Sequence, residues 1–152
     1  MADRAEARLI EHGIVLPPVP GTGGNYIPAK TVGHLVHLSG VISIGSNDII
    51  TGTVGANRSI QEGYMAARAC ALTQLAILRK YLGSLDLIKN VISVNGYVNC
   101  IPGFADSPKV INGASDVLIE VLGDAGQHVR TAIGVSALPR NALVELQMVV
   151  EI

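Results

Sequence analysis

Residues 59–83 read SIQEGYMAARACALTQLAILRKYLG and predict the most clearly marked helix of the chain. Ser59 and Glu62 have the spacing of a capping box, in which each residue bonds a free backbone N–H at the helix start. Apolar side chains then recur at steps of three and four, which gives one face suited to burial against a sheet. The members of this face are Ile60, Tyr64, Ala67, Ala71, Leu75, Leu78 and Leu82. Gly83 ends the helix, because glycine readily adopts the left-handed conformation of a C-terminal cap.

A second helix is predicted from the same periodicity further along the chain. Pro108 suits its first turn, where the missing N–H of proline costs no hydrogen bond. Its buried face comprises Val110, Ala114, Val117 and Val121. Gly123 and Gly126 mark its end.

Strands are predicted where apolar and β-branched runs lie between turn residues. We expect an antiparallel hairpin in residues 26–44, a single strand in 88–101 and a second hairpin in 129–152 that turns at residues 139–141. This order of hairpin, helix, strand, helix and hairpin indicates an α+β fold. It has one mixed sheet, with both helices packed on the same face. Another surface must then cover the opposite face of the sheet.

The length of 152 residues fits a single domain. Within it, residues 1–24 are expected to form a short helix over residues 2–12 and a loop rich in proline and glycine, and residues 25–152 the main part. The chain is 49% hydrophobic and only 15% charged, which is little charge to cover the surface of a monomer. The composition therefore favours self-association over the alternative of an unusually apolar monomer.

Several classes of function are disfavoured by the composition. The net charge is −1, the 11 lysines and arginines are scattered, and aromatic residues make up 3%, so no nucleic-acid partner is expected. The four histidines are dispersed, which predicts no metal site. No apolar run reaches membrane-spanning length, so no membrane partner is expected. Cys70 and Cys100 lack a CxxC spacing and are typical of reduced thiols in a cytoplasmic protein.

Arg130 is the most prominent candidate binding residue. It begins the apolar run 131–135 in a chain with few charges. An arginine fixed at this point can bind a carboxylate through two parallel hydrogen bonds, which suggests a small carboxylate as ligand. The alternative is an exposed arginine at a strand end, since most arginines lie on the surface.

The C-terminal third of the chain resembles the signature of the RidA/YjgF family, which includes proteins called L-PSP-like endoribonucleases. In order and spacing, Arg130-Thr131, Leu138-Pro139 and the Val-Glu-Leu-Gln of residues 144–147 are similar to the family's Arg-Ser, Leu-Pro and Val-Glu-Ile-Glu. Three earlier matches are Gly24-Asn25-Tyr26 to the family's Gly-Pro-Tyr, Ser39-Gly40 to its Ser-Gly, and Asn112 to an asparagine in its second helix.

The resemblance implies a chorismate-mutase-like fold in a homotrimer, with the sheets packed inward as a barrel and three clefts between the subunits. It also implies an imine deaminase, a hydrolase that needs no cofactor and converts reactive 2-imino or enamino acids to 2-oxo acids and ammonia. Arg130 would bind the substrate carboxylate. The residues expected to line the pocket beside it are Tyr26, Ser39, Gly40, Asn112 and Thr131.

One departure from the family bears directly on catalysis. The family glutamate that activates water is matched by Gln147, whose amide cannot act as a general base. Glu145 has the same orientation on the predicted strand and is the candidate substitute. His128, two residues before Arg130, is a further candidate for the cleft, with an exposed loop position as the alternative. The sequence therefore leaves open a deaminase and a non-catalytic binder of small carboxylates, with endoribonuclease activity as a third reading.

Overall fold

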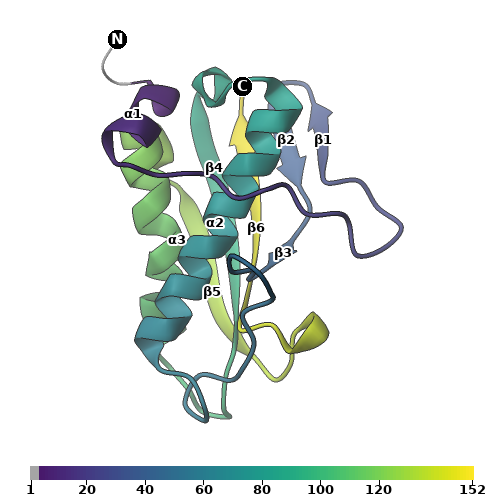
Figure 1. Cartoon of the computed structure of the whole chain (residues 1–152), viewed down its shortest axis with the longest axis vertical. Helices are drawn as coiled ribbons and strands as arrows, with labels where there is room; N and C mark the ends of the chain where they lie inside the picture. Colours follow the sequence, from purple (N-terminus) through teal and green to yellow (C-terminus); the bar gives the residue numbers. More distant parts are fainter. Residues whose placement is uncertain (1–3) are drawn as a thin grey trace.

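The computed structural model describes residues 4–152, which form one mixed sheet and three α-helices (Figure 1). The helices are α1 (Ala5–Glu11), α2 (Ile60–Leu82) and α3 (Ser107–Leu122). The strands are β1 (Ala29–Val32), β2 (Leu35–Leu38), β3 (Val41–Ile42), β4 (Asn90–Asn99), β5 (Val129–Val135) and β6 (Val144–Glu151). None of the helices in the described part combines the length and apolar character needed to cross a membrane.

The predicted helix starts and ends are confirmed for α2. The Ser59 hydroxyl accepts a hydrogen bond from the Glu62 N–H at 3.1 Å, and the Glu62 carboxylate accepts one from the Ser59 N–H at 3.1 Å. Gly83 caps the other end with a φ of 90°. Of the predicted N-terminal helix, residues 5–11 are helical and residues 2 and 3 lie outside the described part.

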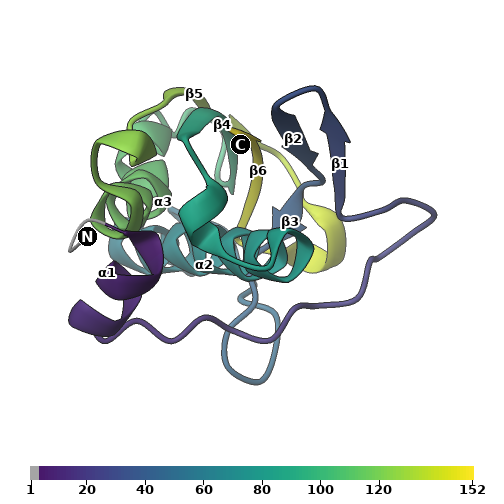
Figure 2. The same cartoon turned by 90° about the horizontal axis from the view of Figure 1, so that it is seen from above.

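The predicted single sheet with its helices on one face is confirmed (Figure 2). Along β6, Val144, Leu146, Met148 and Val150 are fully buried beneath the helices, while the residues between them are half-buried on the other face. The strand order is β1-β2-β6-β4-β5, with β3 pairing with β6 beyond the end of β2. The first predicted hairpin is present as the antiparallel pair β1 and β2.

The second predicted hairpin is wrong. Strands β5 and β6 are not neighbours, because β5 pairs in parallel with β4 and β6 lies between β2 and β4. Helix α3 makes the crossover that a parallel pair requires, so β5 takes the edge. The buried alternation of β6 suits the centre of the sheet, where it bonds neighbouring strands along both of its edges.

Helices α2 and α3 approach each other most closely at Gly113, where a Cβ atom would overlap the backbone carbonyl oxygen of Tyr64. We expect Gly113→Ala to lower the free energy of unfolding by about 2 kcal/mol or more, because backbone atoms cannot turn aside as a side chain can. The better helix propensity of alanine, about 1 kcal/mol, offsets only part of this loss. Urea unfolding followed by circular dichroism measures it.

The matched control is Asn112→Ala, since Asn112 is the exposed neighbour on the same helix. Its stability should stay within about 0.5 kcal/mol of the wild type. Equal stability of both variants would show that the helices can move apart at no cost.

Candidate functional site

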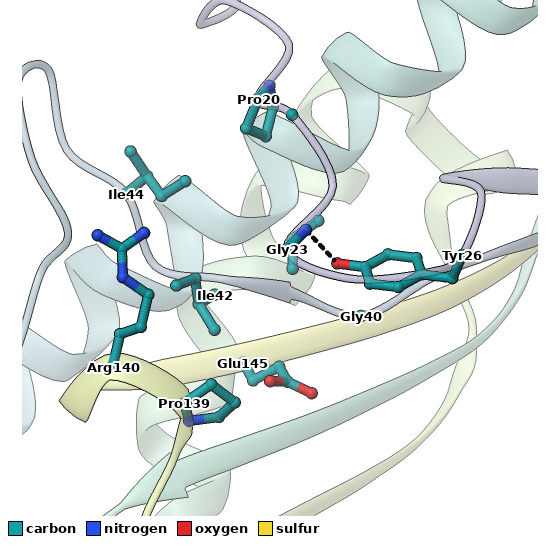
Figure 3. A pocket seen from close by; sticks show the side chains of 11 residues that line it. Pro20, Gly23, Tyr26, Gly40, Ile42, Ile44, Pro139, Arg140 and Glu145 are labelled. Carbon is teal, nitrogen blue, oxygen red and sulfur yellow. Dashed lines mark hydrogen bonds between the residues drawn. The ribbon is translucent and has the colours of Figure 1, made fainter.

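A cavity of about 500 Å³ lies at the edge of the sheet where β2 gives way to β3. The N-terminal loop, residues 40–44 and the start of β6 with its preceding turn form its walls. Its polar side chains are Tyr26, Arg140 and Glu145, and its walls are otherwise mainly proline, glycine, valine and isoleucine (Figure 3). Such a concave, mostly apolar site with a few polar groups is typical of small-molecule binding.

Glu145 is the acid of this cavity. Its Oε2 lies only 2.9 Å from where a Cβ atom of residue 40 would be, so the carboxylate rests against Gly40 and a larger residue would displace it. Burial raises the pKa of this carboxyl above its usual value. No hydrogen bond or ion pair to the carboxylate is found within residues 4–152. An unengaged carboxylate with a raised pKa is suited to general acid–base chemistry.

Of the predicted pocket residues, Tyr26 lines this cavity and Ser39 lies beside it. The Tyr26 hydroxyl accepts a hydrogen bond from the Gly23 N–H at 3.0 Å, which fixes the ring at the cavity wall (Figure 3). The Ser39 hydroxyl donates to the Ile27 carbonyl at 2.6 Å and lines a small adjoining hollow with Tyr26. We call Tyr26, Ser39, Gly40 and Glu145 the Glu145 group.

Gln147 shares the open face of β6 with Glu145 but is not among the residues that line the cavity. Its Nε2 donates to the carbonyl oxygens of Leu38 at 2.9 Å and Met148 at 3.2 Å. Its Oε1 accepts from the Asn95 amide at 3.1 Å. These contacts tie β6 to β2 and β4, so the Gln147 amide is engaged in bridging the sheet.

Arg130 lies on the helix side of β5, because its register partner Val94 is buried beneath the helices. Its Nη1 donates to the Ser115 hydroxyl at 3.1 Å, and its Nη2 donates to the Pro108 carbonyl at 3.2 Å. The Ser115 hydroxyl is also 2.9 Å from Nε2 of His128. Arg130, Ser115 and His128 thus form a connected cluster beside α3.

Asn112 is exposed on the same helix, one turn after Pro108, and Thr131 is exposed on the opposite face of β5. We call Asn112, Ser115, His128 and Arg130 the Arg130 group. Strands β4 and β6 separate this group from the cavity at the β3 edge. Within one chain most of the predicted site residues therefore divide into these two groups at opposite edges of the sheet. Gln147 lies between them, and Thr131 faces away from Arg130.

Gln74 supports the site from α2 and was not predicted from the sequence to do so. It is fully buried on α2, and its Nε2 donates to the carbonyl oxygens of Ser39 and Leu146, both at 3.0 Å. It thereby anchors the backbone beside Gly40 from the helix side of the sheet. The available signal was its spacing, because Gln74 is three residues after Ala71 and four before Leu78 on the apolar face of α2.

We expect Gln74→Leu to destabilise the protein by about 1–3 kcal/mol, because two buried carbonyl groups would lose their donor. Thermal or urea unfolding measures this loss. Gln61→Leu on the exposed side of the same helix is the matched control and should change stability by less than about 0.5 kcal/mol. A Gln74→Leu protein as stable as the control would contradict an anchoring role for the amide.

Arg140 was expected only as part of the turn at residues 139–141, and the structure brings it to the cavity wall. For metal binding, no group of three or more His, Cys, Asp or Glu side chains is suitably placed in the described part of the chain.

Comparison with known proteins gives a consistent result. A family model described as "YjgF/chorismate_mutase-like, putative endoribonuclease" matches residues 6–152. "Protein TCP17" of Trypanosoma cruzi is 39% identical, over 98% of this chain and 94% of its own length. A solved protein of unknown function from Agrobacterium tumefaciens is 39% identical with a TM-score of 0.88, covering 99% of this chain and 93% of its own. A solved "putative endoribonuclease" of Shewanella oneidensis MR-1 is 33% identical with a TM-score of 0.93, covering 98% and 99%.

Proposed function

Because the chain belongs to the RidA/YjgF family, with its chorismate-mutase-like fold, we propose that it hydrolyses reactive 2-imino acids to 2-oxo acids and ammonia. The observation that supports this most strongly is the half-buried, unengaged Glu145 carboxylate against Gly40 in a cavity of small-molecule size. The raised pKa makes this carboxylate a better proton acceptor than an ordinary glutamate, which suits a group that must accept and return a proton.

The proposed reaction needs only one acid–base group and one water. Glu145 takes a proton from the water as the water oxygen adds to the imine carbon. The electron pair of the C=N bond moves to nitrogen, and Glu145 returns the proton to that nitrogen to give the neutral carbinolamine. Glu145 then transfers the hydroxyl proton of the carbinolamine to its amino nitrogen, so that the C=O bond forms, the C–N bond breaks and ammonia leaves. An imine is already electrophilic, so positioning the water and the imine supplies the remaining rate enhancement.

In this proposal Arg130 binds the substrate carboxylate. The guanidinium is fixed by Ser115 and Pro108 and can present its remaining N–H groups to a carboxylate. Because the Arg130 and Glu145 groups lie at opposite edges of one sheet, the proposed cleft joins the Arg130 group of one subunit to the Glu145 group of the next. The homotrimer expected for the family would form three such clefts and cover the open sheet face.

Two other functions would use the same scaffold. A non-catalytic binder would take up a 2-oxo acid without turning over an imine. An endoribonuclease, the activity named for the Shewanella protein, would have to bind RNA, and here 11 scattered basic residues face 12 acidic ones.

The test is ammonia release from 2-iminobutanoate and 2-iminopropanoate generated in the assay, beside cleavage of a single-stranded RNA. We expect imine turnover above the rate in water and no RNA cleavage. Binding of 2-oxobutanoate without turnover would instead establish the non-catalytic binder, and RNA cleavage that follows the protein through purification would establish the nuclease.

A further inference from the structure

Arg140 differs from the other arginines of the described chain in its contacts. The arginines that interact with another group of the chain are Arg4, Arg8, Arg58, Arg68, Arg79 and Arg130. For the side chain of Arg140, no hydrogen bond or ion pair occurs within residues 4–152. Burial alone accounts for the raised pKa of Glu145, and Arg140 does not contribute to it. The guanidinium at the cavity wall is therefore available to an anion from outside the chain.

The backbone at Arg140 is held in an unfavourable conformation. Arg140 and the following Asn141 have φ angles of 55° and 59°, in the left-handed region that arginine rarely adopts. The turn is fixed by bonds from the Asn141 N–H to the Leu138 carbonyl at 3.1 Å and from the Gly52 N–H to the Asn141 carbonyl at 3.1 Å. Strained residues of this kind gather at ligand sites, and this one directs a cation along the cavity wall.

The cavity is lined by both Glu145 and Arg140. Its volume of about 500 Å³ falls within the range of small-molecule sites, about 300–1,000 Å³. In Figure 3 the Arg140 side chain rises beside Ile44, whereas the Glu145 carboxylate extends in another direction beneath the strand. Ile42, Ile44 and Pro139 provide apolar wall in the same cavity. Methylene groups suit this wall, and an anionic end group suits Arg140.

We infer that Arg140 recognises a second anionic group of the substrate, so that the site prefers 2-imino acids whose side chain ends in a carboxylate. The inference rests on the proposed function, in which the reacting carbon lies at Glu145 and Arg130 of a neighbouring subunit binds the first carboxylate. The planar guanidinium of Arg140 matches the second carboxylate with two parallel N–H groups.

The test measures binding of two stable product analogues, 2-oxobutanoate and 2-oxoglutarate, by isothermal titration calorimetry. The wild type should bind the dicarboxylate about tenfold more tightly than the monocarboxylate. Arg140→Gln and Arg140→Asn should reduce this ratio to about one, with 2-oxobutanoate affinity unchanged. Asparagine tolerates the left-handed backbone, which guards against a folding defect. Arg68→Gln, which removes an arginine paired with Glu120 outside the cavity, should keep the wild-type ratio.

A ratio that is the same in wild type and both Arg140 variants would overturn the inference, as would a wild type without preference or without binding of either acid. Ammonia release from 2-iminobutanoate by the same samples shows whether a negative result concerns the Arg140 site or the deaminase activity itself. Turnover with a ratio insensitive to Arg140 leaves the deaminase standing and removes the inference. A ratio that depends on Arg140 without turnover leaves the anion site standing and removes the deaminase.

Discussion

Replacing Glu145 with glutamine is expected to lower kcat for 2-iminobutanoate by about 10²–10⁴-fold, because the amide cannot take the proton of the attacking water. Glutamine keeps the size of the side chain that rests against Gly40, so 2-oxobutanoate binding should change little. Ammonia release under saturating substrate measures the loss. Glu151→Gln is the matched control, since Glu151 lies on the same face of β6 and bonds Asn90 at 2.8 Å.

A Glu145→Gln protein with wild-type kcat would remove this residue from the mechanism.

Gln147→Glu is the converse test. Because the Gln147 amide donates to two carbonyl oxygens, a carboxylate there should lower stability without raising kcat. A gain in rate would point to Gln147 as the position at which the family glutamate acts.

The pH dependence of the Glu145 variant has a defined sign. Burial raises the pKa of Glu145 in the folded protein, so folding favours the protonated carboxyl. Its contribution to the free energy of unfolding is fully present below the unfolded pKa and is lost as the pH rises through the folded pKa, because the buried carboxylate must then ionise. Glu145→Gln should therefore raise Tm relative to wild type at about pH 7 and lose this advantage at about pH 4. For the same reason, wild-type kcat should fall on acidification at a pH above the ordinary range of a glutamate.

Replacing Arg130 with alanine is expected to lower kcat/KM by about 10²–10³-fold, because a charge-assisted carboxylate contact would be lost. Arg130→Lys should recover only part of the loss, since lysine lacks the planar pair of donors. Arg68→Ala is the control, because Arg68 pairs with Glu120 of α3 and lies outside the Arg130 group. Its kcat/KM should stay close to that of the wild type. Unchanged kcat/KM in Arg130→Ala would place the carboxylate anchor elsewhere.

Mixing the two inactive variants tests whether the site lies between subunits. If each cleft takes Arg130 from one subunit and Glu145 from its neighbour, refolding equal amounts of Arg130→Ala and Glu145→Gln together should restore about a quarter of wild-type activity. Each variant refolded alone should stay inactive. No recovery in mixed oligomers would show that both residues act within one chain or that the groups never meet.

The helices illustrate what could be predicted locally. The capping box at Ser59, the apolar face of α2 and the glycine at residue 83 are all encoded within one stretch of chain, and the structure contains them as predicted. Gln74 lay in the same stretch but was not recognised, because the partners of its amide, Ser39 and Leu146, are 35 and 72 residues away in sequence.

The sequence by itself determined the α+β class, the single sheet with its helices on one face, the family, and the alternation that gives Glu145 and Gln147 the same orientation on β6. Only the tertiary structure decided that β6 lies between β2 and β4, that Glu145 reaches a cavity while Gln147 bridges strands, and that Arg130 lies at the opposite edge. The reason is physical. Side-chain periodicity follows from the local geometry of each strand, whereas strand neighbours and cavity walls depend on hydrogen bonds and packing between segments far apart in the chain.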